Sequence, residues 1–203
     1  IGAYGQDDRV CGYAALKGLF DARTPEKTAV CVLADKEEIG SMGVGGMQSQ
    51  AFDTFIDDLC GCLGAHLRTC FENSFCLSAD VNAGYDPNFA DVYDKRNSCF
   101  INQGITLCKY TGSRGKSGAS DASAEAMGHI RGILDRADVL WNVSELGKIE
   151  AGGGGTVALH MANRNIDTVD AGVPVLGMHA PFEVTGKLDC YMMYLAMKAV
   201  YGS

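Results

Sequence analysis

Five ionisable side chains stand at the borders of apolar segments in the sequence. Glu37 and Glu38 follow the apolar run 28–34, Asp80 follows residues 74–79, His179 follows residues 173–177, and Asp7 precedes an apolar stretch. In an open α/β sheet, side chains beyond the carboxyl ends of the strands meet in one crevice. Several carboxylates share such a pocket when a cation offsets their charges, and carboxylates with an imidazole suit a divalent metal. The residues therefore predict a metal site.

The elements that position these side chains alternate between helix and strand. Apolar spacing predicts helices over 9–21, 47–65, 121–136 and 154–163 and a long helix ending 180–201, with strands over 28–34, 74–79, 99–108 (a strand or a hairpin), 166–170 and 173–177. Residues 28–34 are too uniformly apolar for a strand with one solvated face, so we expect a buried strand there. The alternation predicts an α/β fold, a three-layer α/β/α sandwich with a central, mostly parallel (mixed) sheet.

Composition narrows the class of protein. The 203 residues suffice for one domain, and a net charge of −8 argues against a nucleic-acid partner. The sequence contains no apolar run of the roughly 18 residues that a membrane span needs. Nine cysteines lie mostly in apolar runs, and the Cys60–Cys62 pair has no second pair at zinc-knuckle spacing. We therefore expect reduced cysteines in a cytoplasmic protein without membrane partners.

Six motifs occur in the order in which one enzyme family has them. They are YGQDDRVCGYAAL, ADKEEIGSMG, SADVNAGYDPNF, KYTGSRGKSGASDA, GKIEAGGGGTVA and VPVLGMHAPFEV. Together they resemble the catalytic domain of the aspartyl aminopeptidase family of dinuclear zinc aminopeptidases, over nearly the whole chain. The resemblance implies a zinc-exopeptidase-like fold, one metallopeptidase catalytic domain over 1–203, and two divalent ions, zinc first, with cobalt or manganese as alternatives.

The resemblance also implies a role for each candidate metal-site residue. Asp7 matches the carboxylate that bridges the two metals. Glu38 and His179 match the other ligands of one metal, and Asp80 matches a ligand of the second. Glu37 matches the general base that takes a proton from the metal-activated water and passes it to the leaving amine.

The implied substrate is a peptide, from which the enzyme removes the N-terminal residue. The residues removed include acidic ones. Lys109 lies where the family has a lysine facing the substrate, and Gly153 and Gly154 match a loop near the substrate. Ala83 stands where some relatives have a substrate-contacting histidine, so the preference for acidic N-terminal residues stays open. The resemblance further implies a homo-oligomer.

The family has one more histidine ligand upstream of the bridging aspartate. Only six residues precede Asp7 here, and none is histidine. We therefore expect the chain to be the C-terminal part of a longer enzyme. Two alternatives stay open: a non-catalytic assembly subunit with an incomplete metal site, and a metal-dependent deacylase or carboxypeptidase on the same scaffold.

Overall fold

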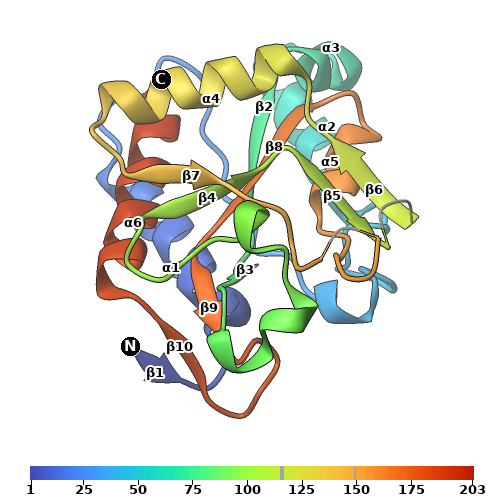
Figure 1. Ribbon diagram of the computed structural model, residues 1–203. Coiled ribbons are helices and arrows are strands. Elements are labelled where there is room, and N and C mark those ends of the chain that lie inside the picture. Colours follow the sequence, from blue (N-terminus) through green and yellow to red (C-terminus); the bar gives the residue numbers. More distant parts are fainter. Residues whose placement is uncertain (115–116, 149) are drawn as a thin grey trace.

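The computed structural model describes residues 1–114, 117–148 and 150–203. Its helices are α1 (Gln6–Asp21), α2 (Ala51–Leu63), α3 (Leu67–Glu72), α4 (Ala124–Arg136), α5 (Ala158–Ala162) and α6 (Lys187–Tyr201), with 3₁₀ helices η1 (Glu37–Ile39), η2 (Pro87–Val92) and η3 (Lys95–Asn97). Its strands are β1 (Gly2–Ala3), β2 (Phe75–Ala79), β3 (Asn82–Ala83), β4 (Ile105–Cys108), β5 (Tyr110–Ser113), β6 (Ser117–Asp121), β7 (Trp141–Val143), β8 (Asp167–Gly172), β9 (Pro174–Leu176) and β10 (Glu183–Thr185). Figure 1 shows β2, β8, β4 and β7 in the middle of the molecule with α4 above them, and β1 and β10 at its lower edge.

The described strands form two four-stranded sheets and one hairpin. The central sheet has the order β2-β8-β4-β7, in which β2 and β8 are parallel, β8 and β4 antiparallel, and β4 and β7 parallel. The second sheet has the order β1-β10-β9-β3, and β5 pairs with β6. The predicted mixed α/β class is confirmed, with its strands divided among these sheets.

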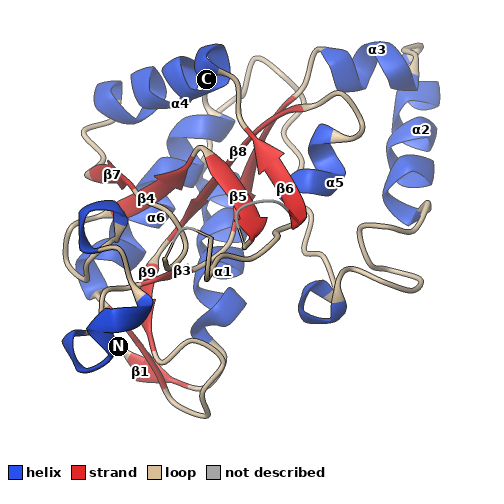
Figure 2. Ribbon diagram, turned by 45° about the vertical axis from the view of Figure 1, so that its right-hand side comes forward, coloured by secondary structure: helices blue, strands red, loops and turns tan. Residues whose placement is uncertain are grey.

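Side chains on the central sheet alternate between two different environments. On β8, Val169 and Ala171 belong to the main apolar core, together with residues of α1, α4 and α6. The intervening Asp170 points to the opposite face and lines a cavity. Because successive strand residues face opposite sides, one face is an apolar core and the other carries polar side chains. A second apolar cluster lies under α2, α3 and α5, which Figure 2 shows gathered at one end of the molecule.

The strand predicted over 28–34 does not form. The segment has no regular secondary structure, no described strand pairs with it, and Val32 and Leu33 are 44% and 63% exposed. An apolar run becomes a strand only where a neighbour completes its backbone hydrogen bonds. Glu37 and Glu38 therefore follow an unpaired segment and lie in η1.

Other boundaries differ from the sequence prediction for local reasons. α4 begins at Ala124 because the hydroxyl of Ser123 accepts a hydrogen bond from the backbone N–H of Ala126. Of the predicted strand 99–108, only β4 forms, because Asn102 and Gly104 adopt positive φ angles in a turn. The helices predicted over 47–65 and 154–163 are shortened to α2 and α5, and α1 starts three residues earlier than expected. Within the described residues, no helix has the length and apolar character needed to cross a bilayer.

Candidate metal centre

Most of the candidate residues line one cavity of about 320 Å³, next to the polar face of the central sheet. Its wall combines acidic, apolar and glycine residues: Asp7, Glu37, Glu38, Asp80, Val81, Asn82, Ala83, Val92, Tyr93, Cys108, Thr111, Leu146, Gly147, Gly153, Gly154, Gly155, Thr156, Asp170, Met178 and His179. The side chains come from segments far apart in the sequence. The fold therefore brings together residues that the sequence could only place at the borders of separate elements.

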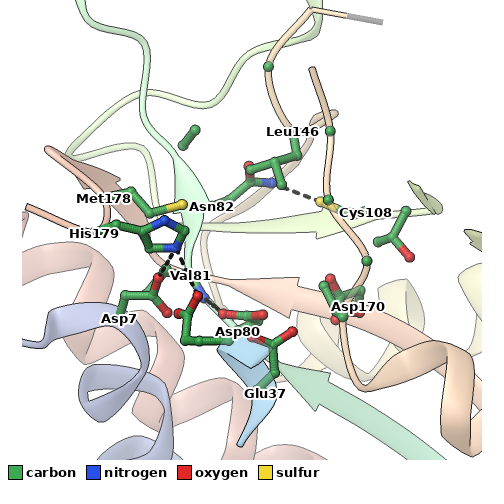
Figure 3. Close-up of a pocket in the computed structure, with 18 of the residues that line it drawn as sticks. Asp7, Glu37, Asp80, Val81, Asn82, Cys108, Leu146, Asp170, Met178 and His179 are labelled. Carbon is green, nitrogen blue, oxygen red and sulfur yellow. Dashed lines mark hydrogen bonds and ion pairs between the residues drawn. The ribbon is translucent and has the colours of Figure 1, made fainter. Parts of the chain in front are cut away.

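Three of these residues converge on one point, and we call them the three-ligand cluster: Asp7, Glu38 and His179. Their ligand atoms all lie within 4.8 Å of one another. The Nε2 atom of His179 is 3.0 Å from Asp7 Oδ2 and 3.3 Å from Glu38 Oε2 (Figure 3). The side chain of Asp7 is 7% exposed, whereas those of Glu38 and His179 are 58% and 62% exposed. The cluster is thus open to solvent on one side.

Irregular backbone positions each member of the cluster. Asp7 lies in the first turn of α1 but has φ −82° and ψ 107°, which are not helical values. Glu38 lies in η1, which Lys36 and Gly40 flank with left-handed backbone angles. His179 follows β9 in a turn closed by a 2.8 Å hydrogen bond from the N–H of Ala180 to the carbonyl of Gly177, and its φ is 65°. A positive φ is uncommon for a residue other than glycine.

The carboxylates in the cavity are crowded, and this raises their pKa values. Burial and the neighbouring Glu38 charge raise the pKa of Asp7 to about 6. Burial, Glu38 and Asp7 raise the pKa of Glu37 to about 7. Burial and the charges of Asp170, Asp8, Asp7 and Glu37 raise the pKa of Asp80 well above its ordinary value. The site as it stands has an excess of negative charge, which a cation would offset.

Asp80 lines the same cavity, next to Glu37 (Figure 3), but does not belong to the three-ligand cluster. Its Oδ1 accepts a 2.7 Å hydrogen bond from the N–H of Val81. Asp80 follows β2 directly, as expected from the sequence, so its position is fixed by the central sheet. The structure therefore separates Asp80 from the cluster while keeping both on one cavity.

The expected substrate residues divide between the cavity and the surface. Gly153 and Gly154 line the cavity, and a Cβ on Gly153 would lie 2.1 Å from the carbonyl oxygen of Gly112. Gly153 also has a φ of 89°, so the loop requires glycine there. Lys109 does not line this cavity; its ammonium forms an ion pair with exposed Asp121.

Sequence reasoning missed the polar floor of the cavity. Asn82 Oδ1, Thr111 Oγ1 and Asp170 Oδ1 are buried without a hydrogen-bond partner within the described parts of the chain. Burial raises the pKa of Asp170 to about 6, while the nearby hydroxyls of Ser78 and Thr156 lower it. The one sequence signal for Asp170 is an acid inside the apolar stretch VDAGV. Buried polar atoms without a hydrogen-bond partner on a cavity wall can form hydrogen bonds with a bound polar ligand.

The donor set of the cluster fits zinc. Zn²⁺ takes imidazole nitrogen and carboxylate oxygen ligands, and catalytic zinc sites commonly have three protein ligands. Asp7, Glu38 and His179 supply two carboxylates and one imidazole, with solvent access on one side. Fold and cluster together define a mixed α/β protein with a candidate divalent-metal site beside a cavity.

Comparison with known proteins identifies the family. Residues 1–201 match the family model described as aminopeptidase I zinc metalloprotease (M18). The chain is 46% identical over 208 residues to a probable M18 family aminopeptidase 1 of Borreliella burgdorferi, covering 99% of this chain and 45% of that protein. The probable M18 family aminopeptidase 1 of Clostridium acetobutylicum is 44% identical over 192 residues, covering 93% of this chain and 41% of that protein. The chain belongs to the M18 aminopeptidase family.

Solved structures agree with this assignment. An M18 aminopeptidase of Thermotoga maritima superposes with a TM-score of 0.95 at 41% identity, covering 99% of this chain and 46% of that one. Aminopeptidase I of C. acetobutylicum gives a TM-score of 0.92 at 42% identity, covering 100% and 44%. The Saccharomyces cerevisiae mApe1 dodecamer gives 0.77 at 27% identity, covering 98% and 45%. The chain thus spans less than half the length of the relatives it matches.

Proposed function

We propose that the protein is a metal-dependent aminopeptidase whose metal centre is built on the three-ligand cluster. The observation that carries the proposal is the convergence of Asp7, Glu38 and His179 within 4.8 Å on the wall of a cavity. Membership of a zinc metalloprotease family supports zinc as the ion. A second ion would be held by Asp7, as a bridging ligand, and Asp80.

The chemistry divides between the metal and the chain's own residues. Two zinc ions in these positions would supply Lewis-acid activation of a water and of the scissile carbonyl. Glu37 lines the cavity beside the cluster, and neither of the proposed metal positions uses its carboxylate. We assign it the role of general base, which takes a proton from the attacking water and delivers it to the leaving amine.

The cavity wall supports a preference for uncharged N-terminal side chains over acidic ones. Its lining includes the apolar side chains of Val81, Val92, Leu146 and Met178. No lysine or arginine of the described chain is part of the lining, and Lys109 is paired elsewhere. An acidic side chain would therefore enter a cavity that already has an excess of carboxylates. We propose that apolar residues are the better substrates.

Two features support proposals about the setting of the enzyme. All nine cysteines are free thiols, as expected in a reducing compartment, so we propose a cytoplasmic location. The mApe1 structure of S. cerevisiae is described as a dodecamer, which supports a homo-oligomer here. Mass measurement of the purified protein in solution tests the second proposal.

The test of the activity is hydrolysis of leucyl and aspartyl chromogenic amides by the purified protein. We expect release of the N-terminal residue, loss of activity with a chelator, restoration by zinc, and faster turnover of the leucyl substrate. Glu37→Gln should lower kcat by about 10²–10⁴-fold while zinc content stays unchanged, because the base acts on the reacting proton. Glu72→Gln, which removes an exposed carboxylate at the end of α3, is the matched control.

Several outcomes would contradict the proposal. Full activity of the Glu37→Gln variant would show that Glu37 is not the general base. Loss of the last residue from a short peptide, instead of the first, would identify a carboxypeptidase. Bound zinc without turnover of any amide would favour a non-catalytic subunit.

A further inference from the structure

Glu183 is a buried carboxylate that contacts two members of the three-ligand cluster through their backbone. Glu183 is the first residue of β10 and is 2% exposed. One oxygen, Oε1, accepts a 2.7 Å hydrogen bond from the N–H of His179. The other, Oε2, accepts a 3.1 Å hydrogen bond from the N–H of Asp7. One side chain therefore joins two ligands that are 172 residues apart in the sequence.

The backbone at both ligands explains why an acceptor is needed there. The N–H groups in the first turn of a helix have no partner within that helix, and Asp7 lies in the first turn of α1. His179 is held at φ 65°, a conformation that costs free energy for a residue with a side chain. A buried N–H without a partner costs about 1–3 kcal/mol. The carboxylate of Glu183 satisfies both N–H groups at once.

The sheet places Glu183 between the two segments that lead to the ligands. β10 pairs with β1, in register Ala3 with Glu183, and β1 leads directly into the segment of Asp7. On its other edge β10 pairs with β9, which leads into the turn of His179. The position of Glu183 is therefore fixed relative to both ligands by backbone hydrogen bonds.

We propose that Glu183 is a positioning residue, which sets the separation of Asp7 and His179 around the zinc ion. The inference rests on the proposed metal centre, although it does not depend on peptidase activity. A carboxylate suits the task because both of its oxygens accept hydrogen bonds. In Glu183→Gln an amide NH₂ would face one of the backbone N–H groups, so one ligand would lose its partner. Glu183→Asp would keep the charge but shorten the reach to the two N–H groups.

The chain offers a matched control in Asp189. This carboxylate is also buried, at 0% exposure, and accepts two backbone hydrogen bonds, from Asn102 (2.7 Å) and Gly104 (2.8 Å). It lies in the first turn of α6 and does not line the cavity. Asp189→Asn therefore removes the same kind of interaction from a part of the protein that has no metal ligands.

The experiment measures zinc affinity of the metal-free protein by competition with a chromophoric chelator, together with urea unfolding. We expect Glu183→Gln and Asp189→Asn both to lower the free energy of unfolding. Only Glu183→Gln should weaken zinc binding, by about 10–100-fold, the range found when residues that orient metal ligands are replaced. The absorption of the Co²⁺-substituted protein should shift in Glu183→Gln and stay unchanged in Asp189→Asn.

The results separate this inference from the proposed function. Wild-type zinc affinity in folded Glu183→Gln would overturn the positioning role, and so would an equal loss of affinity in Asp189→Asn. If Glu183→Gln does not fold, Glu183→Asp is measured in its place, with the same loss expected and the same outcome decisive. If the wild type binds zinc but hydrolyses no amide, the aminopeptidase proposal fails and the role of Glu183 is still decided by affinity.

Discussion

The two sides of the cavity present their acidic groups in different ways. The three-ligand cluster is partly open to solvent, and its ligand atoms already lie within 4.8 Å of one another. On the other side, Asp80 and Asp170 line the cavity, the charge of Asp170 raises the pKa of Asp80, and Asp170 Oδ1 is buried without a partner among the described residues. The ligand atoms of the cluster are thus close enough together to hold one cation, as proposed above, whereas the second side has a buried carboxylate oxygen without a hydrogen-bond donor among the described residues.

The difference shows what fold and charge each contribute to a metal site. The sheet β1-β10-β9-β3 and the carboxylate of Glu183 fix two ligands of the cluster without a metal. Asp80 and Asp170 are positioned by β2 and β8, but burial disfavours the ionised forms of both, and neighbouring negative charges disfavour that of Asp80 as well. The fold fixes the positions of the carboxylates on both sides of the cavity. Of the two sides, only the three-ligand cluster also contains an imidazole.

The largest effect should come from breaking the cluster. His179→Ala removes its only imidazole, and we expect the first zinc ion to bind at least about 100-fold more weakly, more than for a residue that only orients a ligand. Asp80→Asn should leave that affinity unchanged and lower the zinc content from about two ions per chain to about one. Chelator competition and elemental analysis measure both quantities. His129→Ala is the control, because His129 packs against Phe75 away from the cavity. If His179→Ala bound zinc as tightly as the wild type, His179 would not be a zinc ligand.

An intermediate effect should come from neutralising the second side. The pKa of Asp170 is raised from 3.8 to about 6, so the folded protein binds this proton more tightly than the unfolded chain. Its contribution to stability is present below about pH 4 and is lost as the pH rises through about 6. By linkage this amounts to a loss on the order of 3 kcal/mol, which Asp170→Asn should abolish.

Urea unfolding of the metal-free protein between about pH 4 and 7 checks this prediction. Asp170→Asn should be more stable than wild type near neutral pH, with a flatter dependence on pH. Asp167→Asn, at the exposed start of the same strand, is the control and should keep the wild-type slope. An unchanged slope in Asp170→Asn would show that the carboxyl group finds a partner in solution.

The smallest effect is expected outside both sides. Lys109 and Asp121 form an exposed ion pair, and such pairs contribute about 0–1 kcal/mol to stability. Lys109→Ala should therefore change the free energy of unfolding by less than about 1 kcal/mol and leave kcat/KM for the leucyl substrate near the wild-type value. A large rise in KM for the aspartyl substrate alone would place Lys109 at the substrate, as the family resemblance implies.

The sequence predicted those parts of the site that lie at the borders of apolar segments. Asp7, Glu38, Asp80 and His179 were found in this way, and the structure places all four on one cavity. Asp170 was missed because a single acid within an apolar strand has no periodic signal. Glu183 lies inside a recognised motif, but its two hydrogen bonds depend on pairings of strands only two or three residues long, which apolar patterning cannot reveal.

The fold shows the same division. The sequence predicted β2, α4 and α6 because each has its own apolar pattern and buries it within the described chain. The pattern of residues 28–34 is as clear, yet no strand forms, because strand formation also depends on a hydrogen-bonding neighbour. The local apolar pattern of a segment therefore predicts its secondary structure correctly only where the segment also has a packing or hydrogen-bonding partner.

The unpaired segment 28–34 has a practical consequence for handling the protein. It is uncharged, it contains no proline, and it exposes Val32 and Leu33. Short apolar segments of this kind, with free backbone N–H and C=O groups, are templates for cross-β association between chains. Purified as these 203 residues, the protein should lose solubility as its concentration rises, and a charged substitution at Leu33 should delay that loss without touching the cavity.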